Sequence, residues 1–335
     1  MKALSSSRAS DVVALALALG ITGCSQTRNL GSSSPHGLLP VDERNPIVLL
    51  NDGVYDNWQG EYALLLANSG GSRLAGIAVG TSPNLPEIKT NMEGWSLLVE
   101  KARASGLSDV PELTESPSAK LVQPSNGEIG ATTPNGSGGA HLIVELSREL
   151  SLPYRPLVVV TGGRLTDVAD AYLLDPTVAE RTVVVSSLGT TTDTGAVMMA
   201  PNGEMDPWAD FIVTQHFRFV QVSAFYDQLM DVPASRVWKL PANPLGQWIS
   251  DKQSKVWSLQ KAADQVAVLA VNLPTFAVEV ERVSAAATIA ADANAGPELQ
   301  TSPDGAAWLV RKCDGTKAAE RLWQALAELP ASPGP

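Results

Sequence analysis

The sequence predicts an α/β fold in which a mostly parallel sheet is covered by helices on both faces. Short apolar runs rich in Val, Ile and Leu alternate with segments whose apolar residues recur at helical spacing. This alternation is typical of βαβ units, whose strands are buried on both faces and pair in parallel. With 335 residues, 44% of them hydrophobic, the chain can bury a sizeable core.

The elements can be followed in order from Asn45 onward. Each predicted strand is a short apolar run; these are 47–50, 74–80, 157–161, 182–186 and 217–223. Each predicted helix has apolar residues at 3.6-residue spacing; these are 57–68, about 90–104, 140–150, 166–174 and 206–214. Residues 106–139 have no periodicity and are rich in Pro, Gly, Ser and Asn, so we expect a long loop over one edge of the sheet.

The pattern is looser after Val256. It predicts a helix near 252–271, strands at 276–283 and 307–311, and a helix at 316–328. The sequence contains no internal repeat, which favours one domain over residues 45–330.

Composition narrows the classes of partner. The formal net charge is −11 and no Lys/Arg cluster occurs, which argues against nucleic-acid binding, because phosphates are neutralised by concentrated positive charge. The three histidines are scattered without metal-ligand spacing, at His36, His141 and His216.

The N-terminus has the features of an export signal. Lys2 and Arg8 precede an apolar stretch from Val12 to Ile21 that is too short for a permanent membrane span. The following Ile21–Cys24 segment resembles the lipobox of bacterial lipoproteins, in which the Cys is lipidated after cleavage. The alternative is a disordered start or an uncleaved anchor.

The lipobox resemblance divides the chain and implies a location. It implies a signal peptide at 1–23, a lipidated Cys24 with a flexible tether to residue 44, and membrane contact through the lipid alone. Ser25, rather than an acid, implies the outer membrane, with the domain facing the periplasm. Cys313 then has no disulfide partner, and we expect a buried, inert thiol.

Two acids mark the end of the first predicted strand. Asp52 and Asp56 follow the apolar run 47–50, at the sheet edge where open α/β sheets bind ligands. Acids and amides at this edge form either a cation and polyol site or an Asx-rich turn that caps a helix. Thr166 and Asp206 likewise occupy positions where helix N-caps belong.

Three ordered motifs together resemble the inosine–uridine-preferring nucleoside hydrolase family. Residues Leu50–Asn57 match its Asp-x-Asp-x-Gly-x-Asp-Asp motif at the second and third acids, which are Asp52 and Asp56. Residues Thr161–Arg181 resemble its Gly-Pro-Leu-Thr-Asn turn, helix and Asp-Pro…Glu-Arg connection. Residues 202–209 resemble its Asn-x-x-x-Asp-Pro-Glu-Ala motif. The resemblance covers about residues 46–328 and implies a single nucleoside-hydrolase-like domain.

The resemblance also implies a calcium ion that holds the attacking water and the ribose hydroxyls. By position, Asp52 would be a ligand and the general base, and Asp56 would contact the ribose. Asn57, the main-chain carbonyl of Thr166, and Asn243 would complete the calcium ligands. Asn202 and Asn84, the latter in the polar turn after strand 74–79, would bind the substrate.

The sequence departs from the family pattern at charged positions. Asn57 and Asn243 stand where the family has calcium carboxylates, and calcium affinity depends on the number of charged ligands. The leaving-group acid is also missing at Ala242, and Tyr226 or Asp227 is the candidate substitute.

Two functions are compatible with this combination of matching and missing site residues. The first is a lipid-anchored hydrolase of ribonucleosides or related N-glycosides; the second is a non-catalytic lipoprotein that binds a nucleoside or sugar. An oligomer is compatible with either.

Overall fold

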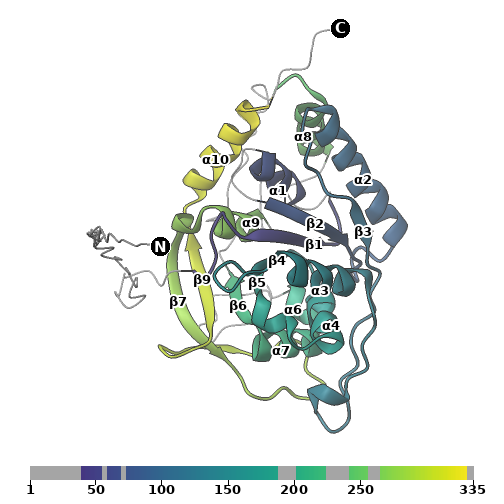
Figure 1. Ribbon diagram of the computed structural model, residues 1–335, viewed down its shortest axis with the longest axis vertical. Helices are drawn as coiled ribbons and strands as arrows, with labels where there is room; N and C mark the ends of the chain where they lie inside the picture. The colour runs from purple at the N-terminus through teal and green to yellow at the C-terminus, as the bar shows by residue number, and fades with distance from the viewer. Residues whose placement is uncertain are drawn as a thin grey trace, which may run out of the picture. The chain divides into compact units, whose positions relative to one another are not determined.

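The computed structural model describes residues 39–54, 59–68, 73–187, 201–223, 241–255 and 265–329 (Figure 1). All of these belong to one compact unit within Ser34–Pro335. The predicted signal peptide, Cys24 and most of the tether lie outside the described residues. None of the described helices combines the length and apolarity needed to cross a membrane.

A single mixed sheet is built from the nine strands of the described residues. Its order is β3-β2-β1-β4-β5-β6-β9-β7-β8. Pairing is parallel from β3 through to β9, and β7 runs antiparallel to both of its neighbours. The strands are β1 (Pro46–Asn51), β2 (Arg73–Val79), β3 (Leu113–Glu115), β4 (Leu157–Thr161), β5 (Thr182–Ser187), β6 (Arg218–Val222), β7 (Ala277–Ala285), β8 (Leu299–Thr301) and β9 (Ala307–Cys313). The prediction of a mostly parallel sheet is confirmed.

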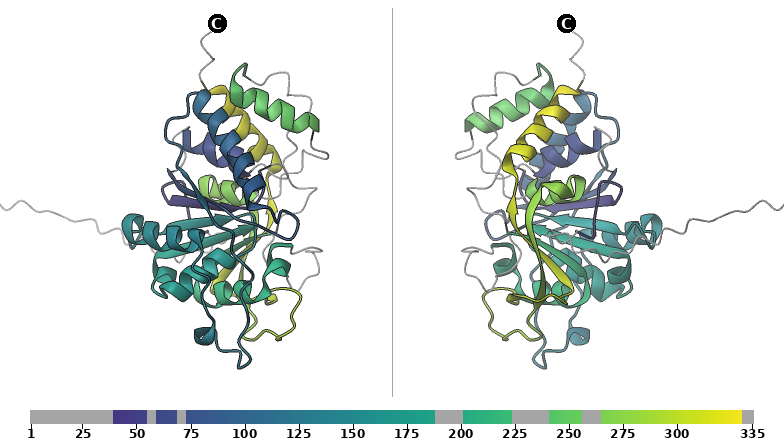
Figure 2. Two further views of the ribbon diagram at one scale, coloured as in Figure 1. Left: turned by 90° about the vertical axis from the view of Figure 1, so that its right-hand side faces the viewer. Right: turned by 90° about the vertical axis from the view of Figure 1, so that its left-hand side faces the viewer.

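Helices cover both faces of this sheet (Figures 1 and 2). One face is packed by α1 (Gln59–Asn68), α2 (Ile88–Ala104), α8 (Pro244–Lys255), α9 (Gln265–Asn272) and α10 (Gly315–Ala327). The other face is packed by α3 (Gly138–Leu150), α4 (Thr166–Leu174) and α7 (Pro207–His216). Shorter elements are η1 (Ile129–Ala131), α5 (Val178–Arg181), α6 (Pro201–Met205) and η3 (Pro274–Phe276).

The core has two halves because side chains alternate across each strand. In β1, Ile47 and Leu49 enter the core beneath α1 and α2, whereas Val48 and Leu50 enter the core beneath α3 and α4. All four are almost fully buried. A continuous apolar run, rather than an alternating one, is what a strand covered on both faces requires.

The predicted elements differ from the structure mainly where they are short or late in the chain. The predicted bounds of β4 and α4 are those of the structure. The loop predicted at 106–139 contains the short edge strand β3 and the turn η1. The helix predicted near 252–271 overlaps the end of α8 and most of α9, and the residues between these two helices lie outside the described part.

Cys313 closes β9 and is buried, as predicted. Desolvation raises the pKa of its thiol to about 12.

Candidate functional site

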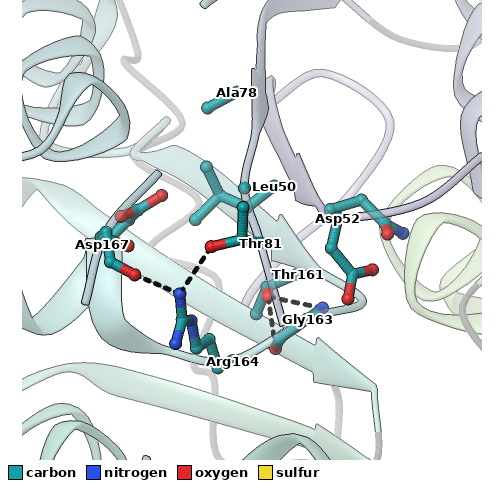
Figure 3. Close-up of a pocket in the computed structure, with 11 residues that line it drawn as sticks. Leu50, Asp52, Ala78, Thr81, Thr161, Gly163, Arg164 and Asp167 are labelled. Atoms are coloured by element: carbon teal, nitrogen blue, oxygen red, sulfur yellow. Dashed lines mark hydrogen bonds between the residues drawn. The ribbon is translucent and has the colours of Figure 1, made fainter. Parts of the chain in front are cut away.

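A small pocket lies where three adjacent parallel strands end (Figure 3). Asp52 follows β1, Gly80 follows β2 and Thr161 closes β4. This is the sheet edge where open α/β folds bind ligands. The empty volume is about 280 Å³, including space open to solvent. The lining residues are Leu50, Asn51, Asp52, Ala78, Gly80, Thr81, Ser118, Thr161, Gly163, Arg164 and Asp167.

Asp52 presents a largely buried carboxylate to this pocket, with 8% of the residue exposed. Its Oδ1 accepts the backbone N–H of Gly53 at 2.7 Å, so part of its role is local, as the Asx-turn interpretation requires. Within the described part of the chain it forms no other hydrogen bond or ion pair. Its second carboxylate oxygen is therefore available to a ligand or a water molecule.

Arg164 enters the same pocket from the loop between β4 and α4. Its Nη2 donates to Oγ1 of Thr81 at 2.9 Å and to the carbonyl of Ser118. Figure 3 shows the guanidinium directed toward Thr81, with Asp52 on the other side of Thr161 and Gly163. Among the described residues no carboxylate pairs with Arg164. Its positive charge therefore remains in the pocket.

Asp167 forms the pocket wall next to Ser118. The residue is 6% exposed, and its Oδ2 accepts the Ser116 hydroxyl at 2.8 Å. Desolvation raises the pKa of Asp167, and the neighbouring charge of Asp170 acts in the same direction, against hydrogen bonds from three serine side chains. Asp167 thus keeps its proton to a higher pH than an exposed aspartate does.

Asp206 and Thr166 join two helices beside the pocket. Asp206 caps α7, accepting the N–H of Ala209 at 3.2 Å, as the cap interpretation predicts. Thr166 is not a cap: Leu165 holds that position, and the Thr166 hydroxyl donates to Oδ2 of Asp206 at 2.7 Å. Thr166 is fully buried and does not line the pocket. Thr166 is the first residue of α4, and a carbonyl at this position regularly accepts the N–H of the residue four positions later.

The two predicted substrate-binding asparagines occupy different surroundings. Asn202 lies in α6, is 5% exposed, and its Nδ2 donates to the carbonyl of Ser187 at the end of β5. This places Asn202 at the same sheet edge as Asp52, two strands away. Asn84 is exposed in the turn between β2 and α2 and does not line the pocket. Their roles in binding stay predictions.

Asn243 lies away from the pocket. Its Oδ1 accepts the N–H of Gly246 at 2.8 Å, as a cap of α8, and the hydroxyl of Ser105 at 3.2 Å. Ser105 follows the last residue of α2, whereas Asn91 near the start of α2 donates to the pocket residue Gly80. At 1.5 Å per residue these two ends are about 20 Å apart. The structure does not bring Asn243 to Asp52, because the polypeptide uses its amide as a helix cap.

The described residues do not fit a calcium ion. Calcium favours six to eight oxygens with several carboxylates. No group of three or more His, Cys, Asp or Glu is arranged for a metal within the described part of the chain. Asp52 shares its pocket with the guanidinium of Arg164, which repels a cation. Four predicted site residues lie outside the described residues: Asp56, Asn57, Tyr226 and Asp227.

Sequence reasoning did not identify Arg164 and Asp167 as site residues. Both lie in the stretch 161–167 that resembles the Gly-Pro-Leu-Thr-Asn turn, where Arg164 takes the place of Pro and Asp167 that of Asn. Two charged residues at uncharged positions of a strand-end motif were the available signal. The loop that supplies Ser116 and Ser118, within residues 106–139, contains no recognisable motif.

Comparison with known proteins establishes the fold. No protein-family model and no curated protein matches the sequence. Among solved structures, an inosine–uridine preferring nucleoside hydrolase from Bacillus anthracis aligns with a TM-score of 0.63 at 14% identity, covering 85% of this chain and 100% of that one. A purine-preferring ribonucleoside hydrolase from Gardnerella vaginalis gives 0.59 at 15% identity, covering 86% and 100%.

A third similar structure is the type III effector protein XopQ complexed with adenosine diphosphate ribose. Its TM-score is 0.53 at 12% identity, and the alignment covers 86% of this chain and 95% of that one. At these identities the likeness shows a shared fold. The chain thus has a nucleoside-hydrolase-like fold.

Proposed function

We propose that this protein hydrolyses the N-glycosidic bond of a ribonucleoside or a related ribosyl compound, with Asp52 as general base. The observation that carries the proposal is the Asp52 carboxylate, mostly buried just after β1 and facing a pocket, with one oxygen that has no hydrogen-bond partner among the described residues. The similar structures include nucleoside hydrolases, and the XopQ structure holds a ribosyl compound.

The chemistry needs a base at this position. Cleavage of an N-glycosidic bond passes through an oxocarbenium-like sugar, which a nearby negative charge stabilises. Water attacks the anomeric carbon, its proton passes to Asp52, and the carbon–nitrogen bond breaks. The departing base takes a proton from solvent or from a side chain. Asp52 would stabilise the developing positive charge and activate the water.

No step of this proposal is assigned to a metal, since the described residues do not fit calcium. Of the predicted calcium ligands, Asn57 lies outside the described residues. The metal prediction is tested separately by melting the protein with and without millimolar calcium, because a ligand bound only by the native state raises the melting temperature.

The test of the enzyme proposal is release of ribose. A panel of purine and pyrimidine nucleosides and nucleotides is incubated with the purified protein, with and without calcium, and reducing sugar is measured. We expect release from at least one compound and a loss of at least ~100-fold in Asp52→Asn, which keeps the shape and removes the base. Asp109→Asn, an exposed site, is the matched control and should keep full activity.

A non-catalytic binding protein is the second candidate. The observation that favours it is Arg164, a cation lining the pocket at which the resemblance implies calcium. In that case calorimetry detects a ribosyl ligand, no compound in the panel releases ribose, and Asp52→Asn binds as tightly as the wild type.

We also propose that the chain is a lipoprotein anchored through Cys24 to the bacterial outer membrane. Lys2, Arg8, the apolar stretch 12–21 and the lipobox-like segment 21–24 support this. Labelled palmitate should be incorporated into the protein expressed in a bacterial host, and Cys24→Ser should abolish incorporation and release the protein from the membrane fraction.

A further inference from the structure

We propose that Arg164 forms an anion subsite in this pocket, so that the ligand is a ribosyl compound that carries a phosphate group. The inference rests on the proposed function for the ribosyl part and on the pocket's own geometry for the phosphate. It narrows the substrate class from uncharged nucleosides to nucleotides and sugar phosphates.

The guanidinium of Arg164 has unused binding capacity. A guanidinium has five N–H donors in a planar fork, and Arg164 uses its Nη2 group on two neutral acceptors, Thr81 and Ser118. Neither of these acceptors is an acid, and within the described residues Arg164 forms no ion pair. The remaining donors can form the bidentate contacts with phosphate oxygens that arginine favours.

Arg164 is also held in place by neighbouring segments. Thr81 follows β2, and Ser118 belongs to the loop 106–139, so two separate segments fix the guanidinium before any ligand arrives. A side chain that is already ordered loses little conformational entropy on binding. A surface arginine with no fixed partner would not have this advantage.

Open space lies at Gly163, the residue next to Arg164. Gly163 separates Asp52 from Arg164 in Figure 3. Among the described residues, a methyl group built at Gly163 would have only the backbone nitrogen of Asp52 within 4 Å, at 3.9 Å. The backbone there has no left-handed conformation that would explain a glycine. The missing side chain therefore leaves room for a ligand between the base and the cation.

The negative charge of Asp52 repels a phosphate group, and this repulsion sets the orientation of the ligand. Figure 3 places the carboxylate and the guanidinium on opposite sides of Thr161 and Gly163. A ligand with a cationic or oxocarbenium-like centre at one end and a phosphate at the other matches this arrangement of charges. The anomeric carbon would face Asp52 and the phosphate would face Arg164.

Calorimetry on the purified full chain tests the subsite with matched probes. The pairs are adenosine 5′-monophosphate against adenosine, and ribose 5-phosphate against ribose, with the Asp52→Asn variant used wherever turnover consumes the probe. Charge-assisted contacts of this kind predict at least ~10-fold tighter binding of each phosphorylated probe. The preference should shrink as salt is raised.

Variants assign the preference to Arg164. Arg164→Met should reduce the phosphate preference to within ~2-fold of none, and Arg164→Lys should keep part of it, because lysine retains the charge without the fork. Arg73→Met removes an exposed arginine at the start of β2, whereas the pocket lies beyond the end of that strand. This variant should leave the preference for phosphorylated probes unchanged. Gly163→Ala should weaken both members of each pair without changing the melting temperature.

The outcomes separate this inference from the proposed function. Equal binding of phosphorylated and unphosphorylated probes by the wild type, or an intact preference in Arg164→Met, overturns the anion subsite. If nucleosides are still hydrolysed in that case, the proposed function stands. If phosphorylated probes bind tightly but no compound releases ribose, the subsite stands and the hydrolase proposal fails. Inorganic phosphate alone, bound as tightly as ribose 5-phosphate, overturns the ribosyl assignment.

Discussion

The hydroxyl of Ser116 donates to Oδ2 of Asp167 at 2.8 Å, and the same oxygen of Ser116 accepts the N–H of Gly139 at 2.8 Å. One serine thus ties the first turn of α3 to the start of α4, behind the wall of the pocket. Asp167 is buried there with no basic partner in the described residues. Its protonation state is set by desolvation and by serine hydroxyls.

Asp167→Asn should change how stability depends on pH. Desolvation holds the pKa of Asp167 above its ordinary value of 3.8, so the folded chain binds this proton more tightly than the unfolded chain. Wild-type stability therefore falls as pH rises from about 3.8 through the folded-state pKa. Asn has no charge to desolvate, so the variant should lack this fall and gain stability relative to the wild type as pH rises.

Urea unfolding of the two proteins between pH 4 and pH 8 measures the effect. Asp109→Asn, which removes an exposed acid, is the control and should track the wild type. Parallel stability curves for Asp167→Asn and wild type across this range would contradict the prediction.

Gly139→Ala should destabilise the protein through the same contact. A Cβ at this position would lie 2.4 Å from Oδ2 of Asp167 and 3.0 Å from the Ser116 hydroxyl. The fold must shift α3 or the carboxyl group, at a cost of roughly 1–3 kcal/mol. Gly130→Ala is the matched control, since a Cβ there meets no atom of the described part of the chain within 4 Å. Equal free energies of unfolding for the two variants would refute the steric argument.

The pair Thr166 and Asp206 should behave as one unit. Asp206 is fully buried and also accepts the N–H of Leu121 at 2.9 Å. Asp206→Ala leaves that N–H and the Thr166 hydroxyl without an acceptor and removes the α7 cap, so we expect a loss of roughly 3 kcal/mol. Thr166→Val should cost roughly 1 kcal/mol. In a double-mutant cycle from urea unfolding, additive losses would show that the pair is not coupled.

Sequence periodicity predicted the sheet well because each central strand is buried on both faces. The runs at β1, β4 and β5 are continuous Val, Ile and Leu, and such runs have no competing interpretation as surface helices. The edge strand β3 was missed because its three residues are half exposed and carry no apolar run. The 3-residue β8 was missed because Leu299 is its only apolar residue, and one apolar residue makes no run.

The site was predicted less completely, since its charges come from different segments. Asp52 was identified because it directly follows a strand. Arg164 is held in the pocket by Thr81 and Ser118, which are 83 and 46 residues away in sequence, so the sequence alone could not show its position. Asn243 was misplaced because a motif position was read as a ligand, and spacing cannot show that the amide caps α8 instead.

Cys313 should resist thiol reagents while the protein is folded. Desolvation raises the pKa of its thiol to about 12, and the thiolate is the reactive form. We expect labelling of Cys313 by iodoacetamide at pH 8 only after addition of denaturant, detected by mass spectrometry of the peptide. Labelling in native buffer at the rate of a free cysteine peptide would contradict the buried placement.

Asp175 joins α3 to the segment after α4. Its Oδ2 pairs with Arg148 and Arg181, each at 2.9 Å, and its Oδ1 accepts the Thr177 hydroxyl at 2.6 Å. Desolvation acts to raise the pKa of Asp175, but the hydrogen bonds from Thr177, Arg181 and Arg148 outweigh it and lower the pKa to about 2.

Asp175→Asn should therefore destabilise the protein at neutral pH and not in strong acid. A carboxyl group with a depressed folded-state pKa contributes stability above its ordinary value of 3.8, and that contribution is lost as pH falls through about 2. We expect a loss of roughly 1–2 kcal/mol at pH 7, shrinking toward zero near pH 2. Glu112→Gln, which breaks only the exposed pair with Arg103, should cost less than ~0.5 kcal/mol. A loss for Asp175→Asn that is equally large at pH 7 and pH 2 would show that packing, and not charge, is the cause.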